Sequence, residues 1–199
     1  MNKPEITRKI LHIVFGILLL ALTILLDQGI YIRILFILFL LAILLTVLHL
    51  KYSIRPIAWI SKENEKRFPL KGLIFFIVGA GLASIIFERD IALASITILT
   101  FGDSICSIAS SILEKRKIRY NGNFKHILGS FCGMVFAFLF ALIFIDPISA
   151  LVGSFFGLAA EAVAIKLGES DADDNIIVPL AAGTVMYLLT RLPLLASLL

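Results

Sequence analysis

Long apolar runs divide the sequence into seven segments of the length that crosses a membrane. A bilayer core about 30 Å thick is spanned by roughly 17 to 25 apolar residues in a helix. Charged or turn-forming residues separate each run from the next. We therefore predict seven transmembrane helices, at residues 10–26, 30–50, 72–87, 91–113, 126–145, 148–167 and 176–189.

The composition is outside the range of soluble globular domains. Of the 199 residues, 60% are hydrophobic and 16% are charged, and the mean hydropathy is +1.03. Gly and Pro are scattered through the apolar runs, so no linker marks a second domain. We predict one all-α domain over residues 1–199, a multi-pass transmembrane helical bundle surrounded by membrane lipids.

The basic residues predict which side of this bundle faces the cytoplasm. Seven spans place the N-terminus on the same side as three of the connections. Of the 18 Lys and Arg residues, only Arg33, Arg89 and Arg191 fall on the opposite side. Because Lys and Arg accumulate in cytoplasmic connections, we predict a cytoplasmic N-terminus, in the plasma membrane of a prokaryote or in an endomembrane. The three connections on the cytoplasmic side are residues 51–71, 114–125 and 168–175.

One carboxylate, Asp103, lies about midway along the predicted fourth span. An ionisable side chain at that depth costs about 2.5 to 3.5 kcal/mol, so it needs a partner or a hydrated cavity. Ser107, Ser110 and Glu114 follow at helical spacing and predict a polar stripe that runs to the cytoplasm. The alternative is a structural ion pair between Asp103 and a basic residue. Gly102 permits a close backbone approach or a break in the helix at this point.

A basic segment follows the stripe and could bind phosphate groups. Its residues Asn121 and Gly122 favour a tight hairpin turn, which would hold several cations together. Clustered cations beside a carboxylate suit a polyphosphate with its magnesium ion. The alternative is the ordinary basic character of a cytoplasmic connection. The cations of this segment are Lys115, Arg116, Lys117, Arg119 and Lys125.

Other ionisable groups approach the same predicted face from distant parts of the chain. Arg8, Lys9 and His12 lie near the cytoplasmic mouth of the first span. Glu161 lies a little over one turn from the cytoplasmic end of the sixth span. We expect these residues to join Asp103 in one hydrated pocket that opens toward the cytosol.

The entrance to the seventh span combines polar residues with a proline. Asp174 and Asn175 are residue types that cap helices, which is the simplest interpretation. Pro179 disfavours a regular helix just before it, so we expect residues 174–178 to run irregularly before the helix begins. Such backbone at membrane depth is tolerated only where it lines a protein-walled or hydrated cavity.

In chain order these short blocks resemble the polyprenol kinase family, which includes dolichol kinase, phytol kinase and CTP-dependent diacylglycerol kinase. The blocks are Arg8-Lys9 with His12, Gly102-Asp103 with the basic segment, Lys125 leading to Gly129-Ser130, Glu161, and Asp174-Asn175 with Pro179. The resemblance implies a membrane enzyme that transfers the γ-phosphoryl group of CTP to the hydroxyl of a lipid alcohol. That alcohol would be a polyprenol, phytol or geranylgeraniol, dolichol or diacylglycerol.

The resemblance also implies roles for individual positions. It assigns Gly102, Asp103 and the cations Lys115, Arg116 and Lys117 to the nucleotide site, followed by Lys125, Gly129 and Ser130. It assigns Asp174 and Asn175 to the last motif. Leu128 departs from the pattern, because relatives usually have Glu there. Either the role of that carboxylate is indirect, or this chain is a divergent or inactive member. Cys106, Ser110 and Glu114 replace the Ala and the two Gly residues that are usual in the family.

Phosphoryl transfer mainly requires positioning and charge neutralisation, and this requirement suggests a division of labour. We expect Asp103 to hold Mg²⁺ or accept the proton of the lipid hydroxyl. Glu161 and Asp174 are further candidate metal ligands. Arg8, Lys9 and His12 would close the site from the first helix. Within this scheme the predicted catalytic residues are Asp103, His12 and Lys125, and the predicted nucleotide-binding residues are Arg8, Lys9, Gly102, Lys115, Arg116, Lys117, Gly129, Ser130 and Asn175.

Two other classes of function remain as alternatives at this stage. A proton- or cation-coupled transporter would place acidic groups in both halves of the bilayer and would show internal repeats, and the sequence has neither. A noncatalytic membrane scaffold would need Asp103 only for stability. We predict no nucleic-acid partner, and the sequence does not fix the oligomeric state.

Overall fold

The computed structural model describes residues 3–60, 68–112, 117–120, 123–162, 166–167, 170–171 and 173–191. Side chains are described for residues 7–57, 68–110, 129–160 and 173–191. The helices are α1 (Lys3–Leu25), α2 (Gln28–Tyr52), α3 (Arg55–Ile60), α4 (Lys71–Ile86), α5 (Arg89–Thr97), the π-helical segment η2 (Ile98–Asp103), α6 (Ser104–Ile112), α7 (Ile127–Ala141), α8 (Pro147–Ala162) and α9 (Asp174–Arg191). The strands are β1 (Lys117–Tyr120), β2 (Asn123–His126), β3 (Lys166–Leu167) and β4 (Ser170–Asp171).

The predicted helical bundle is confirmed, and each predicted span contains a helical segment. Within the described part of the chain, three helices are long and apolar enough to cross a membrane, Thr7–Leu25, Gln28–Tyr52 and Arg89–Ser110. The apolar helices α4, α7 and α8 are shorter than a bilayer requires. The number of spans and the cytoplasmic orientation of the N-terminus therefore stay predictions.

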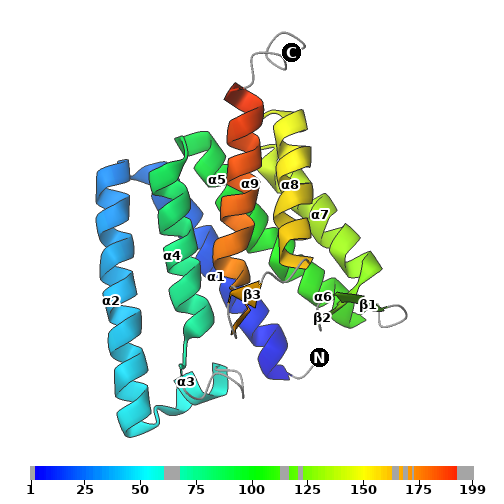
Figure 1. Cartoon of the computed structure of the whole chain (residues 1–199). Coiled ribbons are helices and arrows are strands. Elements are labelled where there is room, and N and C mark those ends of the chain that lie inside the picture. The colour runs from blue at the N-terminus through cyan, green and yellow to red at the C-terminus, as the bar shows by residue number, and fades with distance from the viewer. Residues whose placement is uncertain are drawn as a thin grey trace.

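The two ends of the bundle differ in what they carry. Figure 1 shows both hairpins at the same end as the start of α1, whereas α9 finishes at the opposite end. The starts of α4, α7 and α9 and the ends of α6 and α8 also lie near the hairpins in this view. The chain segments that carry the predicted site residues thus meet at one end of the molecule.

The central helix is not regular, although we predicted one continuous helix over residues 91–113. It consists of α5, η2 and α6, with six π-helical residues between two α-helical segments. In Arg89–Ser110, 78% of the most apolar window is buried, compared with 22% in α1 and α2. A Cβ atom on Gly102 would lie 3.0 Å from Leu158 and 3.2 Å from Ala137. The close approach that Gly102 permits is therefore present, and the helix continues through this point as a π-helical segment and not as a break.

Two short antiparallel hairpins extend the helices at this end. β1 pairs with β2 in the register Lys117↔His126 to Tyr120↔Asn123, which brackets positions 121 and 122. The predicted hairpin is thus confirmed, although those two residues lie outside the described part of the chain. β3 pairs with β4. Two span limits were wrong, because His126 and Lys166–Leu167 belong to strands and not to helices.

The predicted irregular entrance to the last helix is wrong, because α9 is helical from Asp174 and contains Pro179. The backbone N–H groups of Ile176 and Ile177 both donate to the carbonyl of Asp173, at 3.0 and 3.2 Å. This cap lets the helix begin five residues before the proline. Proline removes one i→i−4 hydrogen bond, here the one to the Asn175 carbonyl. That carbonyl lies against Gly79 of α4, where a Cβ would collide with it.

The outer faces of α1 and α2 expose large apolar side chains, as expected of helices that face lipid. Leu25 is 78% exposed, Ile37 is 62% exposed and Phe36 is 60% exposed. In contrast, Leu19 of α1 and Tyr31 of α2 are buried on the inner faces. These two helices are therefore apolar on both sides, which is typical of segments surrounded by hydrocarbon.

Candidate functional site

A buried ion pair joins α1 to the end of η2. The Lys9 Nζ donates to both carboxylate oxygens of Asp103, at 2.9 Å to Oδ1 and 2.7 Å to Oδ2. Only 13% of the Lys9 side chain and 7% of the Asp103 side chain are exposed. Removing such a pair from water costs several kcal/mol per ion before its mutual attraction is counted. The two predicted site residues therefore meet directly, although 94 positions separate them in the sequence.

His12 completes this group from the next turn of α1. Residues three positions apart lie on one face of a helix, so Lys9 and His12 both point toward Asp103. The His12 Nε2 atom is 4.0 Å from Asp103 Oδ2, and it has no hydrogen-bond partner among the described residues. The imidazole packs edge-on against Phe76 of α4, with ring centroids 4.4 Å apart. The aromatic contact holds the ring while a buried nitrogen is left available for a further partner.

The docking of α1 along the central helix explains why these side chains meet. α1 contacts α5, η2 and α6. Gly16 lies so close to Thr100 that a Cβ there would overlap the threonine side chain. Thr100 is fixed because its hydroxyl donates to the Ile96 carbonyl at 2.7 Å. This contact holds the first turns of α1 beside the central helix, where the Lys9 ammonium group reaches Asp103.

Beyond Asp103, the predicted stripe residues Ser107 and Ser110 lie on α6, whereas Glu114 lies outside the described residues. Cys106 donates its thiol hydrogen to the Ser130 hydroxyl, with 3.8 Å between sulfur and oxygen. Gly129 lies against Ser110, where a Cβ would collide with the serine backbone and hydroxyl. The hydroxyls of Ser104 and Ser110 are buried and have no hydrogen-bond partner among the described residues. Polar atoms thus continue from Asp103 toward the β1–β2 hairpin, since β2 contacts both α6 and α7.

A second polar group caps α9 and was only partly anticipated. Asp173 Oδ1 accepts hydrogen bonds from the backbone N–H of Asn175 at 3.1 Å and from its Nδ2 at 2.8 Å. Asp173 Oδ2 lies 3.7 Å from the ammonium group of Lys71, the first residue of α4. Asp173 is therefore the capping residue, and not the predicted pair Asp174-Asn175. A carboxylate just before an apolar helix was the available signal for this cap; nothing in the sequence indicated Lys71.

The remaining predicted residues are placed with less detail. Arg8 is half-buried beside Lys9, and Asp174 is exposed at the first turn of α9. Lys117 and Lys125 lie in the paired strands, and Glu161 lies at the end of α8, but their side chains fall outside the described set. Lys115 and Arg116 lie outside the described residues altogether. Gly102 and Gly129 make close helix contacts, which is a packing role beside the predicted nucleotide role.

The donor atoms at Asp103 fit a magnesium ion that is bound mainly by phosphate. Within the described side chains, no three His, Cys, Asp or Glu residues are arranged to hold a metal ion. Magnesium in phosphate-transferring sites commonly takes one or two carboxylates, with phosphate oxygens and water completing its shell. The Asp103 carboxylate is of the type that supplies one such ligand, but the described residues do not form an all-protein cage.

Comparison with known proteins gives one relevant similarity. The chain is 26% identical over 151 residues to CTP-dependent diacylglycerol kinase 1 of Schizosaccharomyces pombe, which covers 68% of this chain and 67% of that protein. No family model and no solved structure matches the chain. The similarity agrees with the predicted resemblance at the level of a lipid kinase. It does not favour the polyprenol, dolichol or phytol kinases over one another.

Proposed function

We propose that this protein is a membrane lipid kinase that transfers the γ-phosphoryl group of CTP to the hydroxyl of a lipid alcohol. The observation that carries the proposal is the buried Lys9–Asp103 pair with His12 beside it, which joins α1 to η2. The similarity to a CTP-dependent diacylglycerol kinase supports the donor and the general class of acceptor. Diacylglycerol is therefore the first alcohol to test.

Asp103 is the residue best placed to act on the lipid hydroxyl. In the transfer, the lipid oxygen forms a bond to the γ-phosphorus, the bond between that phosphorus and the β,γ-bridging oxygen breaks, and CDP leaves. The hydroxyl proton must pass to an acceptor, and Asp103 is the buried carboxylate that the structure places beside a cation. A magnesium ion, when bound, would neutralise charge on the phosphates, with Asp103 as one ligand and with Glu161 and Asp174 as further candidates.

The cations have separate tasks in this scheme. Lys9 is paired with Asp103 and would face the transferred group, while Arg8 lies one residue away on α1. Lys115, Arg116, Lys117 and Lys125 would bind the triphosphate from the segment that joins α6 to α7. Asn175, whose amide is oriented by Asp173, would contact the nucleotide from the start of α9. His12 would donate to a phosphate oxygen through Nε2, which has no partner among the described residues.

The proposed activity is tested by a donor-and-acceptor panel. The purified protein in lipid nanodiscs is incubated with γ-labelled CTP or ATP and, in turn, with diacylglycerol, phytol, geranylgeraniol, a polyprenol and dolichol. We expect label to pass from CTP to at least one alcohol. Asp103→Asn should lower the rate by about 10²-fold or more, whereas Asp90→Asn, a change at an exposed position in the first turn of α5, should not. A fully active Asp103→Asn variant would refute the assignment of this site.

A further inference from the structure

Three connected polar side chains lie where α4 and α9 begin. The Lys71 ammonium group is 3.7 Å from Asp173 Oδ2. Asp173 Oδ1 accepts from the backbone N–H of Asn175 at 3.1 Å and from the Nδ2 of the same residue at 2.8 Å. One carboxylate therefore joins a cation of α4 to an amide of α9. We call Lys71, Asp173 and Asn175 the α4–α9 polar group.

One face of α4 places this polar group beside His12. Gly72, Phe76 and Gly79 follow one another at steps of four and three residues, so they lie on the same face of the helix. A Cβ on Gly72 would lie 4.0 Å from Asn175 Nδ2, and a Cβ on Gly79 would collide with the Asn175 carbonyl. The Phe76 ring, between the two glycines, packs against His12. Asn175 and His12 thus contact the same face of α4.

Only a short distance separates the α4–α9 polar group from the proposed phosphoryl-transfer site. Phe76 lies four residues beyond Gly72, which is about 6 Å along the helix axis. The His12 ring against it has its Nε2 4.0 Å from Asp103 Oδ2. A nucleoside triphosphate is an extended molecule, so its γ-phosphoryl group can lie at Asp103 while another part of it reaches Asn175.

The Lys71 side chain is held by two neighbours. Its Nζ lies 5.4 Å from the centroid of the Phe75 ring, one turn further along α4, in addition to its contact with Asp173. The Lys71 side chain is 37% exposed, whereas that of Asp173 is only 15% exposed. A carboxylate with so little access to water is costly without a nearby cation. Lys71 supplies that cation and lies on the Oδ2 side, which leaves Oδ1 to Asn175.

The carboxylate of Asp173 determines which end of the Asn175 amide it holds. The oxygen and the nitrogen of an amide exchange places when the group turns over. An ionised carboxylate only accepts hydrogen bonds, so it binds the Nδ2 end and rejects the Oδ1 end. The amide is therefore held in one orientation, with its Oδ1 directed away from Asp173. A fixed hydrogen-bonding group of this kind suits recognition of a polar ligand.

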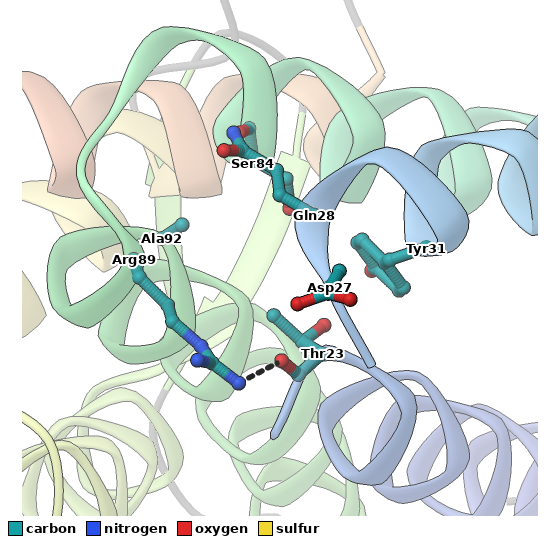
Figure 2. A pocket seen from close by; sticks show the side chains of 7 residues that line it. All are labelled: Thr23, Asp27, Gln28, Tyr31, Ser84, Arg89 and Ala92. Atoms are coloured by element: carbon teal, nitrogen blue, oxygen red, sulfur yellow. Dashed lines mark hydrogen bonds between the residues drawn. The ribbon is translucent and has the colours of Figure 1, made fainter. Parts of the chain in front are cut away.

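A cavity at the opposite end of α4 provides a contrast (Figure 2). There Arg89 donates to the backbone carbonyl of Thr23 at 2.8 Å, and Gln28 Nε2 donates to that of Ser84 at 2.5 Å. The hydroxyls of Thr23 and Ser84 donate to carbonyls of their own helices. These bonds hold helix ends together through the backbone. The α4–α9 polar group instead orients a side chain.

We propose that Lys71 and Asp173 are positioning residues of the nucleotide site and act through Asn175. Lys71 holds the Oδ2 side of Asp173, Asp173 holds the amide of Asn175, and Asn175 contacts CTP. This inference rests on the proposed function, which supplies CTP as the ligand. If the α4–α9 polar group only capped α9, changes to it would alter stability and leave the KM for CTP unchanged.

The test is steady-state kinetics of the full-length protein in lipid nanodiscs, with CTP as donor and diacylglycerol, or the alcohol that the panel selects, as acceptor. Asp173→Asn retains a capping side chain but can hold either end of the Asn175 amide. Lys71→Met removes the cation. Each should raise the KM for CTP about fivefold or more, the loss of about one hydrogen bond, while kcat changes less than about twofold.

Two control variants separate positioning from general effects of charge. Lys71→Arg keeps a cation beside Asp173 and should restore most of the wild-type KM. Lys51→Met removes an exposed cation near the end of α2 and should leave the KM for CTP unchanged. Because KM does not depend on the amount of folded enzyme, a partial loss of folding does not obscure these results.

Double variants with Asn175→Ala decide whether the effect passes through Asn175. In that background, Lys71→Met and Asp173→Asn should raise the KM no further, because their target is already absent. An undiminished further rise, or an unchanged KM in both single variants of an active enzyme, would overturn the proposal. A wild type that neither binds CTP at equilibrium nor transfers phosphate from it would instead refute the proposed function, and this inference with it.

Discussion

The two ends of α1 are attached to the central helix by different chemistry. At one end, Lys9 and Asp103 form a largely buried pair between side chains. At the other end, the exposed Arg89 donates to the carbonyls of Thr23 and Ile24. The last carbonyls of a helix lack intrahelical partners, so an arginine can satisfy them without burial of a carboxylate. The end near Arg89 thus shows that this helix pair can dock without a buried ion pair.

This difference suggests that the Lys9–Asp103 pair exists for more than packing. A buried pair of this kind is often no more stabilising than well-packed apolar residues of similar volume. The neighbouring His12 Nε2 and Ser104 Oγ are also buried without partners among the described residues, which adds to the cost at this end. We therefore interpret the Lys9–Asp103 pair as part of a functional site. The Arg89 contact, in contrast, serves only to hold α1 against the central helix.

The largest effect is expected when the buried Lys9–Asp103 pair is replaced by apolar residues. The double variant Lys9→Met/Asp103→Leu should remain folded, because the charges are removed together. Phosphoryl transfer from labelled CTP should fall below about 10⁻³ of the wild-type rate, since both the proposed proton acceptor and its cation are lost. Arg89→Met should transfer at about the wild-type rate. Wild-type activity in the double variant would show that the Lys9–Asp103 pair has only a structural role.

Removal of one partner should reveal the energetic difference between the two ends. Lys9→Met removes the ammonium group that donates to both oxygens of the buried Asp103 carboxylate, so the free energy of unfolding should fall by about 3–5 kcal/mol. Addition of Asp103→Leu should restore most of that loss. Arg89→Met should cost only about 1 kcal/mol, because water can solvate the carbonyls that it releases. Titration with SDS in mixed micelles measures the free energy of unfolding of the wild type and the three variants. Equal losses in Lys9→Met and Arg89→Met would contradict the proposed difference between the two ends of α1.

The contact midway between the two ends should be sensitive to a single methyl group. Gly16→Ala forces α1 away from the stiff, fixed Thr100, which should cost about 1–3 kcal/mol of unfolding free energy. The matched control is Gly81→Ala, whose Cβ would lie an ordinary 3.6 Å from Leu35 Cδ1. That change should stabilise α4 by about 0.5–1 kcal/mol. Similar thermal unfolding of both variants would show that α1 is not held against η2.

The smallest expected effect separates the chemistry of His12 from its packing. His12→Phe retains a ring against Phe76 but removes the buried nitrogen. We expect about tenfold slower phosphoryl transfer, equivalent to about 1.4 kcal/mol, with little change in thermal stability. Phe15→Leu alters the packing on the same Phe76 ring and serves as the control. A similar loss of rate in both variants would assign His12 a packing role.

Much of the fold could be predicted because apolar run length and turn chemistry are local signals. The helices and the hairpin around Asn121 and Gly122 follow from such signals. Pro179 misled the prediction because its effect depends on neighbours: capping by Asp173 and the space at Gly79 allow a helix to continue through it. The number of spans could not be settled, since three of the apolar helices are shorter than a bilayer.

The site could be predicted only in part. The cost of an isolated Asp103 and the helical spacing of Lys9 and His12 pointed to residues that the structure does bring together. The sequence did not reveal that Lys71 approaches Asp173, or that Tyr31 and Arg89 line one cavity. Those contacts depend on how separate helices pack, and no spacing within a single helix encodes them. The roles of Lys117, Lys125 and Glu161 stay predictions.

The π-helical turn that ends at Asp103 makes chain length at this point as important as residue identity. Such a turn holds one residue more than the α-helical turn it replaces. Six residues wound as a regular α-helix would turn about 100° further than this π-helical segment, so the Asp103 carboxylate would point away from Lys9. Aligned relatives with a regular helix here should therefore show a one-residue gap, which keeps their acidic group on the same face of the helix.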